Sequence, residues 1–91
     1  MAEPKRKSKG AAAMTRMMEA DKAFRGIIGR ITYEEGLPQS DLAGSIGISQ
    51  NTLTNRLKDP GSLSLDELRA LDAAYHLRDA EILAAVRGVR A

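Results

Sequence analysis

The segment from residue 50 to residue 58, QNTLTNRLK, combines hydrogen-bonding side chains with the spacing of a helix. Its outward positions would be four polar residues: Gln50, Asn51, Thr54 and Asn55. A solvated helix face usually carries long charged side chains, because these keep rotamer freedom and pair at i,i+4. Asn and Thr are poor helix formers, so a row of them indicates a face that donates and accepts hydrogen bonds.

A short helix and a tight turn come directly before this polar segment. Pro38 fits a first helical turn, where its missing N–H is not needed. Ala43 is small enough to stand where two helices touch. Gly47 can adopt the positive φ that a tight turn requires. The sequence therefore predicts a helix that begins near Pro38 and stops at Gly47.

The polar segment itself begins with a helix-starting signal. Ser49 is a good N-cap, and Leu53 and Leu57 give the helix an apolar side four residues apart. Two short helices joined by such a turn form a helix-turn-helix unit, predicted here for residues 38–58. The second helix of such a unit can enter the major groove of DNA.

A longer helix is predicted before the unit. Apolar residues recur at three- and four-residue steps from Met14 onward, and Gly36 is a suitable position just past the helix end. Three residues, Met14, Met17 and Met18, are expected to fill a core or an interface rather than a cofactor site.

Two more helices are predicted after the unit. Residues 64–67, SLDE, form a capping box, and the helix that follows would turn four residues inward: Leu65, Leu68, Leu71 and Ala74. His76 would end this helix in a left-handed conformation. The final helix is predicted for residues 79–89. The expected fold is thus all-α, a compact five-helix domain over residues 14–91.

Positive charge is concentrated near the N-terminus. Residues 1–30 carry eight Lys and Arg against three acids, although the net charge of the chain is only +2. Residues 1–13 are predicted to be a flexible, disordered basic arm, which lacks apolar periodicity. Such an arm often meets nucleic acid, and its candidate DNA contacts are four residues: Lys5, Arg6, Lys7 and Lys9.

Composition narrows the class of protein. Ninety-one residues make one small domain, and the absence of Cys leaves neither disulfides nor thiolate metal sites to hold it together. No apolar run approaches a membrane span, and no signal peptide is visible, so a cytoplasmic protein without membrane contact is expected. His76 has no metal-binding companions, and no nucleophile, base and orienter set occurs. We therefore expect no enzyme activity, metal or cofactor.

The stretch from Gly36 to Leu77 resembles the helix-turn-helix domain of lambda repressor, Cro and their phage and bacterial relatives. The segments LPQSDLA, GISQNTLTNRL and SLDELRALDAAYHL follow the order and spacing of that family, and the resemblance extends over residues 24–83. It implies a lambda-repressor-like fold that binds double-stranded DNA.

The resemblance also implies roles for individual residues. Gln39 would lie near a phosphate and brace Gln50, and Lys58 would lie near the DNA backbone. Four side chains would face base edges: Gln50, Asn51, Thr54 and Asn55. Ser49 completes the expected DNA-binding set. Gln and Asn can present a donor and an acceptor to adenine, and Thr can offer a hydroxyl and a methyl group to thymine.

The sequence departs from the family pattern in two places. Pro38 replaces the Ser or Thr that usually caps the first helix of the unit. Arg56 stands where an apolar residue usually packs, and Leu57 is expected to take over that contact. The second departure leaves the rotation of the second helix open by one position.

Two functional hypotheses follow. The first is a sequence-specific, double-stranded DNA-binding transcriptional regulator, a repressor of phage or prophage type that occupies an operator. The alternative is a protein-interaction module of the same fold, such as an antitoxin, anti-repressor or phage accessory protein. A DNA reader would be associated with the nucleoid of a bacterium or a phage-infected host.

The last helix raises a separate question about oligomerisation. Its apolar residues are Ile82, Leu83, Val86 and Val89. They would form a homodimer interface, because such readers use paired half-sites, or they would close the core of the domain itself.

Overall fold

The computed structural model describes the backbone of residues 2–88 and the side chains of residues 10–88. Five α-helices follow one another: α1 (Ala2–Glu35), α2 (Gln39–Ser45), α3 (Gln50–Lys58), α4 (Leu65–Tyr75) and α5 (Asp79–Arg87). A short 3-10 turn, η1 (Pro60–Ser62), lies between α3 and α4. The described part of the chain contains no strand, as the all-α prediction requires.

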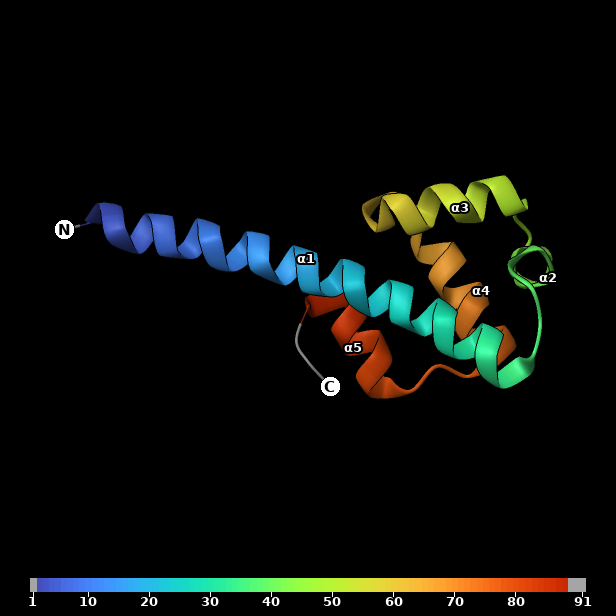
Figure 1. The fold of residues 1–91 in the computed structure, drawn as a ribbon. Coiled ribbons are helices and arrows are strands. Elements are labelled where there is room, and N and C mark those ends of the chain that lie inside the picture. Colours follow the sequence, from blue (N-terminus) through green and yellow to red (C-terminus); the bar gives the residue numbers. More distant parts are fainter. Residues whose placement is uncertain (1, 89–91) are drawn as a thin grey trace.

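Helix α1 sets the shape of the molecule. At 1.5 Å per residue its 34 residues span about 51 Å, close to the 53 Å long axis of the protein. The other helices gather around the C-terminal part of α1, and its N-terminal turns project beyond them (Figure 1). Among residues 2–88, no helix combines the length and apolarity needed to cross a membrane.

The N-terminus differs from the disordered arm expected for residues 1–13. Helix α1 begins at Ala2, twelve residues before the predicted start at Met14. Pro4 lies in the first helical turn, where a missing N–H breaks no hydrogen bond. Residues 11–13 are Ala, the strongest helix former, so the intrinsic preference of this segment agrees with helix. At the other end, Gly36 adopts φ +64° directly after the helix, as predicted.

The core lies between the C-terminal part of α1 and the four shorter helices. Its buried residues are Phe24, Ile27, Ile28, Ile31, Leu42, Ala43, Leu53, Leu71 and Leu77. By contrast, the three methionines on the projecting part of α1 are more than 60% exposed, so they do not belong to this core.

The turn between α2 and α3 follows the predicted chemistry. Pro38 was expected in the first turn of α2, but it is the N-cap residue, in an extended conformation directly before the helix. Its carbonyl accepts from the backbone N–H groups of Asp41 and Leu42. Gly47 has φ +80°, and the N–H of Ile48 returns to the carbonyl of Ala43 at 3.0 Å. These bonds close the tight turn that joins the two helices.

Helix α4 begins with the predicted capping box. The Ser64 hydroxyl accepts from the Glu67 N–H at 3.0 Å, and the Glu67 carboxylate accepts from the Ser64 N–H at 2.9 Å. His76 ends the helix at φ 52°, in the left-handed region as expected.

Two positions on α4 were predicted wrongly. Leu65 is 60% exposed, because this first residue of the helix faces solvent, whereas Leu63 before it and Leu68 three residues later pack against the core. Ala74 is also exposed, since Tyr75 rather than Ala74 continues the inward stripe after Leu71.

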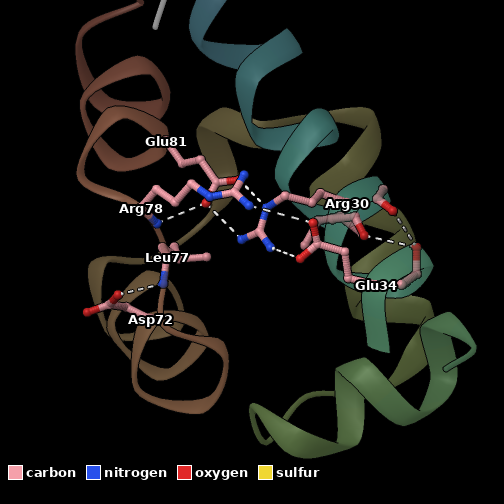
Figure 2. Close-up of polar contacts among 9 residues, drawn as sticks. Arg30, Glu34, Asp72, Leu77, Arg78 and Glu81 are labelled. Atoms are coloured by element: carbon pink, nitrogen blue, oxygen red, sulfur yellow. Dashed lines mark hydrogen bonds and ion pairs between the residues drawn. The ribbon is translucent and has the colours of Figure 1, made fainter. Parts of the chain in front are cut away.

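A polar network fixes α5 against α1 (Figure 2). The Arg30 guanidinium donates from Nε and Nη2 to the two carboxylate oxygens of Glu81, and from Nη1 to Glu34 at 2.7 Å. Glu81 also accepts from the backbone N–H of Arg78 at 2.9 Å. The hydrogen bond from Arg30, followed by that backbone bond, holds the pKa of Glu81 below its ordinary value, against the opposing effect of burial. The same residue therefore starts α5 and ties it to α1.

Candidate nucleic-acid interface

The outward face of α3 carries the polar residues that the sequence singled out. Gln50, Asn51, Asn55 and Lys58 are exposed. Within the described part of the chain, none of the three amide side chains makes a hydrogen bond to protein. Their donors and acceptors are thus available to an external partner.

Thr54 is placed differently from the amides. It is half-buried, and its hydroxyl donates to the backbone carbonyl of Gln50 at 3.0 Å. The hydroxyl oxygen can still accept a hydrogen bond while its proton is used within the helix.

Ser49 acts within the protein as the N-cap of α3. Its hydroxyl oxygen accepts from the Thr52 N–H at 3.0 Å and lies 2.9 Å from the Thr52 hydroxyl. Gln39 is exposed at the first residue of α2, and no hydrogen bond joins its side chain to Gln50 among the described residues. The bracing contact expected of Gln39 therefore does not occur among the described residues.

Leu53 and Leu57 hold α3 from beneath. Leu53 is completely buried, and Leu57 is half-buried and packs against the core. Leu57 therefore makes the apolar contact that the family pattern usually places at position 56. The rotation that the sequence left open is the one with Asn51 and Asn55 facing outward.

Arg56 turns sideways from α3 toward the start of α4. Its Nε and Nη2 donate to the two oxygens of Glu67 at 3.0 and 3.3 Å, and its Nη1 reaches the Ser62 hydroxyl at 3.4 Å. The hydrogen bond from Arg56 is the main reason that the pKa of Glu67 lies below its ordinary value, and burial opposes it. The bonds from Ser64 lower the pKa further.

Arg25 helps to hold the C-terminal end of α3, a role that the sequence did not reveal. It extends from α1, and its Nε donates to the backbone carbonyl of Leu57 at 2.8 Å. That carbonyl belongs to the last turn of α3, where no intrahelical donor remains. The sequence signal was an exposed Arg on α1, which specifies no target because 32 residues separate the two partners.

The remaining predicted contacts lie at the two ends of the chain. The side chains of Lys5, Arg6, Lys7 and Lys9 fall outside the described residues, although their backbone belongs to α1. On α5, Leu83 is 44% and Val86 is 64% exposed, and Ile82 is half-buried. Val89 lies outside the described residues. Leu83 and Val86 thus face away from the core of the domain.

The chain was also compared with known proteins. A family model described as helix-turn-helix matches residues 30–82, more than half of the 91 residues. The match begins in the last turns of α1 and ends within α5, so it includes both helices of the turn. Searches of curated proteins and of solved structures returned no match.

Proposed function

The chain belongs to the lambda-repressor-like helix-turn-helix family of DNA-binding regulators, and from this premise we propose that it is a sequence-specific transcriptional repressor of phage or prophage type. It would act by occupying an operator in double-stranded DNA. The observation that carries this proposal is the outward face of α3, where three exposed amide side chains have no partner within the described protein.

The proposed reading surface consists of Gln50, Asn51, Thr54 and Asn55. The major groove is about 12 Å wide and admits an α-helix, whose own diameter is about 10 to 12 Å. An amide can donate to and accept from adenine at the same time, which makes the Asn and Gln side chains direct readers. Thr54 would contribute its methyl group and its remaining acceptor, because its proton is engaged with Gln50.

Contacts to the sugar-phosphate backbone would hold the reading helix in register. We assign these contacts to Gln39 at the start of α2, to Ser49 at the N-terminal end of α3 and to Lys58 at its C-terminal end. The basic N-terminal segment would add Lys5, Arg6, Lys7 and Lys9, whose charge favours phosphates independently of base sequence.

A homodimer would present two reading helices to paired half-sites. Leu83 and Val86 lie three residues apart on α5 and are both exposed, so they form an apolar face that supports α5 as the interface. Val86→Glu should then abolish the dimer, and Tyr33→Glu, at an 88% exposed site on α1, is a matched control. Sedimentation of the wild type as a monomer, both free and on operator DNA, would assign α5 to the monomer alone.

Selection of bound sites from a random DNA pool tests the central proposal. A single enriched motif and a discrete footprint are expected, with affinity falling steeply as salt rises. Asn51→Ala should cost about 1 to 3 kcal/mol of discrimination at one base pair while the melting midpoint stays close to that of the wild type. Absence of both enrichment and salt dependence would reject DNA reading in favour of a protein-interaction module in the cytoplasm.

A further inference from the structure

The apolar contacts of α3 lie on a single stripe of the helix. Leu53 is the only fully buried residue of the helix, and Leu57, four residues later, is half-buried on the same side. Two contacts on one stripe fix the depth of a helix against its neighbours. They resist rotation about its axis much less, because rocking around the stripe keeps both side chains in the core.

The Arg56–Glu67 pair restrains the flank of this stripe. Both oxygens of Glu67 accept from the Arg56 guanidinium, and the forked geometry fixes direction as well as distance. Glu67 is itself held in place, since one of its oxygens also accepts from the Ser64 N–H at 2.9 Å in the capping box. The flank of α3 is thus bonded to the rigid first turn of α4.

Small rotations of α3 matter for reading bases. Side chains extend about 5 to 6 Å from a helix axis, so a rotation of about 10° moves their tips by roughly 1 Å. Donor–acceptor distances in hydrogen bonds span only about 2.7 to 3.2 Å. A rotation that hardly disturbs Leu53 would therefore take Asn51 and Asn55 out of register with a base edge.

We propose that Arg56 and Glu67 are positioning residues that set the rotation of α3 and thereby the base preference of Asn51 and Asn55. This role rests on the proposed function of α3 as the reading helix. Neither side chain needs to touch DNA, because the pair acts through the orientation of the helix. At position 56 the family pattern usually has an apolar contact, which adapts to small rotations. The Arg56–Glu67 pair is a directional contact instead.

Glu67→Gln is the sharpest perturbation. The amide keeps an acceptor for the Ser64 N–H, so the capping box survives, but it cannot receive the guanidinium fork. Asp66→Asn is the matched control, because it makes the same charge change one residue earlier. Its side chain is 92% exposed, and among the described residues it bonds only to Arg69. Arg56→Lys removes the fork from the other side and keeps the charge.

Two readouts separate positioning from general stability. Residual dipolar couplings of the free protein report the orientation of α3 relative to α4, and their periodic variation along α3 reports its rotation about its own axis. Binding to single-base variants of the selected site reports discrimination. Glu67→Gln and Arg56→Lys are each expected to change the α3 couplings and to lower discrimination at the base pairs read by Asn51 or Asn55 about tenfold. Asp66→Asn should change neither, and a melting curve establishes that each variant is folded.

Each outcome is decisive. Wild-type discrimination in both folded variants overturns the proposal, whether or not the couplings change. If the wild type shows no base discrimination at all, the proposed function fails. The dipolar couplings alone then test whether the Arg56–Glu67 pair sets the orientation of α3. Altered couplings would in that case uphold its control of α3 orientation, and unaltered couplings would overturn it.

Discussion

Gly88 ends α5 in close contact with the backbone of α1, which makes it the position where a single methyl group should be most damaging. A Cβ at Gly88 would lie 2.6 Å from the carbonyl carbon of Arg16 and 2.9 Å from its Cα, with the carbonyl oxygen closer still. Ordinary contact begins at 3.4 Å, and backbone atoms cannot rotate away as a side chain can. Gly88→Ala therefore forces the end of α5 away from α1.

The expected loss has two parts. Gly88 has φ +71°, and an Ala held in this left-handed region costs about 1 kcal/mol. Outward movement by about 0.5 to 1 Å would forfeit about a quarter to a half of the dispersion energy of the affected contacts, including those of the buried Ala84. Overpacking of this kind typically adds about 1 to 3 kcal/mol, so the total is about 2 to 4 kcal/mol.

Gly47→Ala is the matched control for this experiment. Gly47 has φ +80° but nothing within 4 Å of its Cβ position, so only the backbone strain of about 1 kcal/mol remains. Thermal unfolding should place the midpoint of Gly47→Ala about 4 to 8 °C below the wild type and that of Gly88→Ala clearly lower. Amide exchange should accelerate mainly in α5 of the second variant. Equal midpoints for the two variants would refute the close contact with Arg16.

Three further outcomes are expected. Ala43→Leu should lower the unfolding free energy by about 1 to 3 kcal/mol in denaturant titrations, whereas Gly44→Ala, at an open site in the same helix, should leave it equal or higher; matching midpoints would contradict the packing of α2. The folded pKa values of Glu67 and Glu81 lie below the ordinary 4.5, so the stability that these carboxylates contribute is present above that pH and lost as pH falls through the folded values. A variant with both residues changed to Gln should therefore lose less stability than the wild type between pH 5 and pH 3, roughly the window in which carboxylates titrate. Deleting residues 2–9 should weaken specific and nonspecific DNA binding alike and lower the salt slope by about 0.9 for each phosphate that the segment neutralises, and an unchanged slope would show that this segment touches no phosphate.

Local sequence signals predicted most of the helix boundaries. The capping box at Ser64, the N-cap at Ser49 and the left-handed positions Gly36, Gly47 and His76 all occur where expected. Each signal depends on residues within one helical turn or on the backbone preference of a single residue, so it can be recognised without knowledge of the rest of the fold.

The solvent-facing side of α3 at the candidate site could also be predicted from local sequence. The amide row on α3 faces solvent because Leu53 and Leu57 define the opposite, buried side, and this relation follows from the helical period alone. What Arg56 does could not be predicted, since its partner Glu67 belongs to another helix and meets it only after α3 and α4 have docked. The contact of Arg25 with the end of α3 is hidden from the sequence for the same reason.

The sequence by itself thus determined which segments beyond the N-terminal arm are helical, where the turn of the unit lies and which face of α3 is polar. Only the tertiary structure decided that Leu65 lies outside the core while Leu63 and Leu68 pack against it, that α5 leaves Val86 in solvent, and that Gly88 meets Arg16. Helix periods and caps are set by neighbours within a few residues. Docking is set by the fit of whole surfaces distant in the chain, which no short stretch of sequence contains.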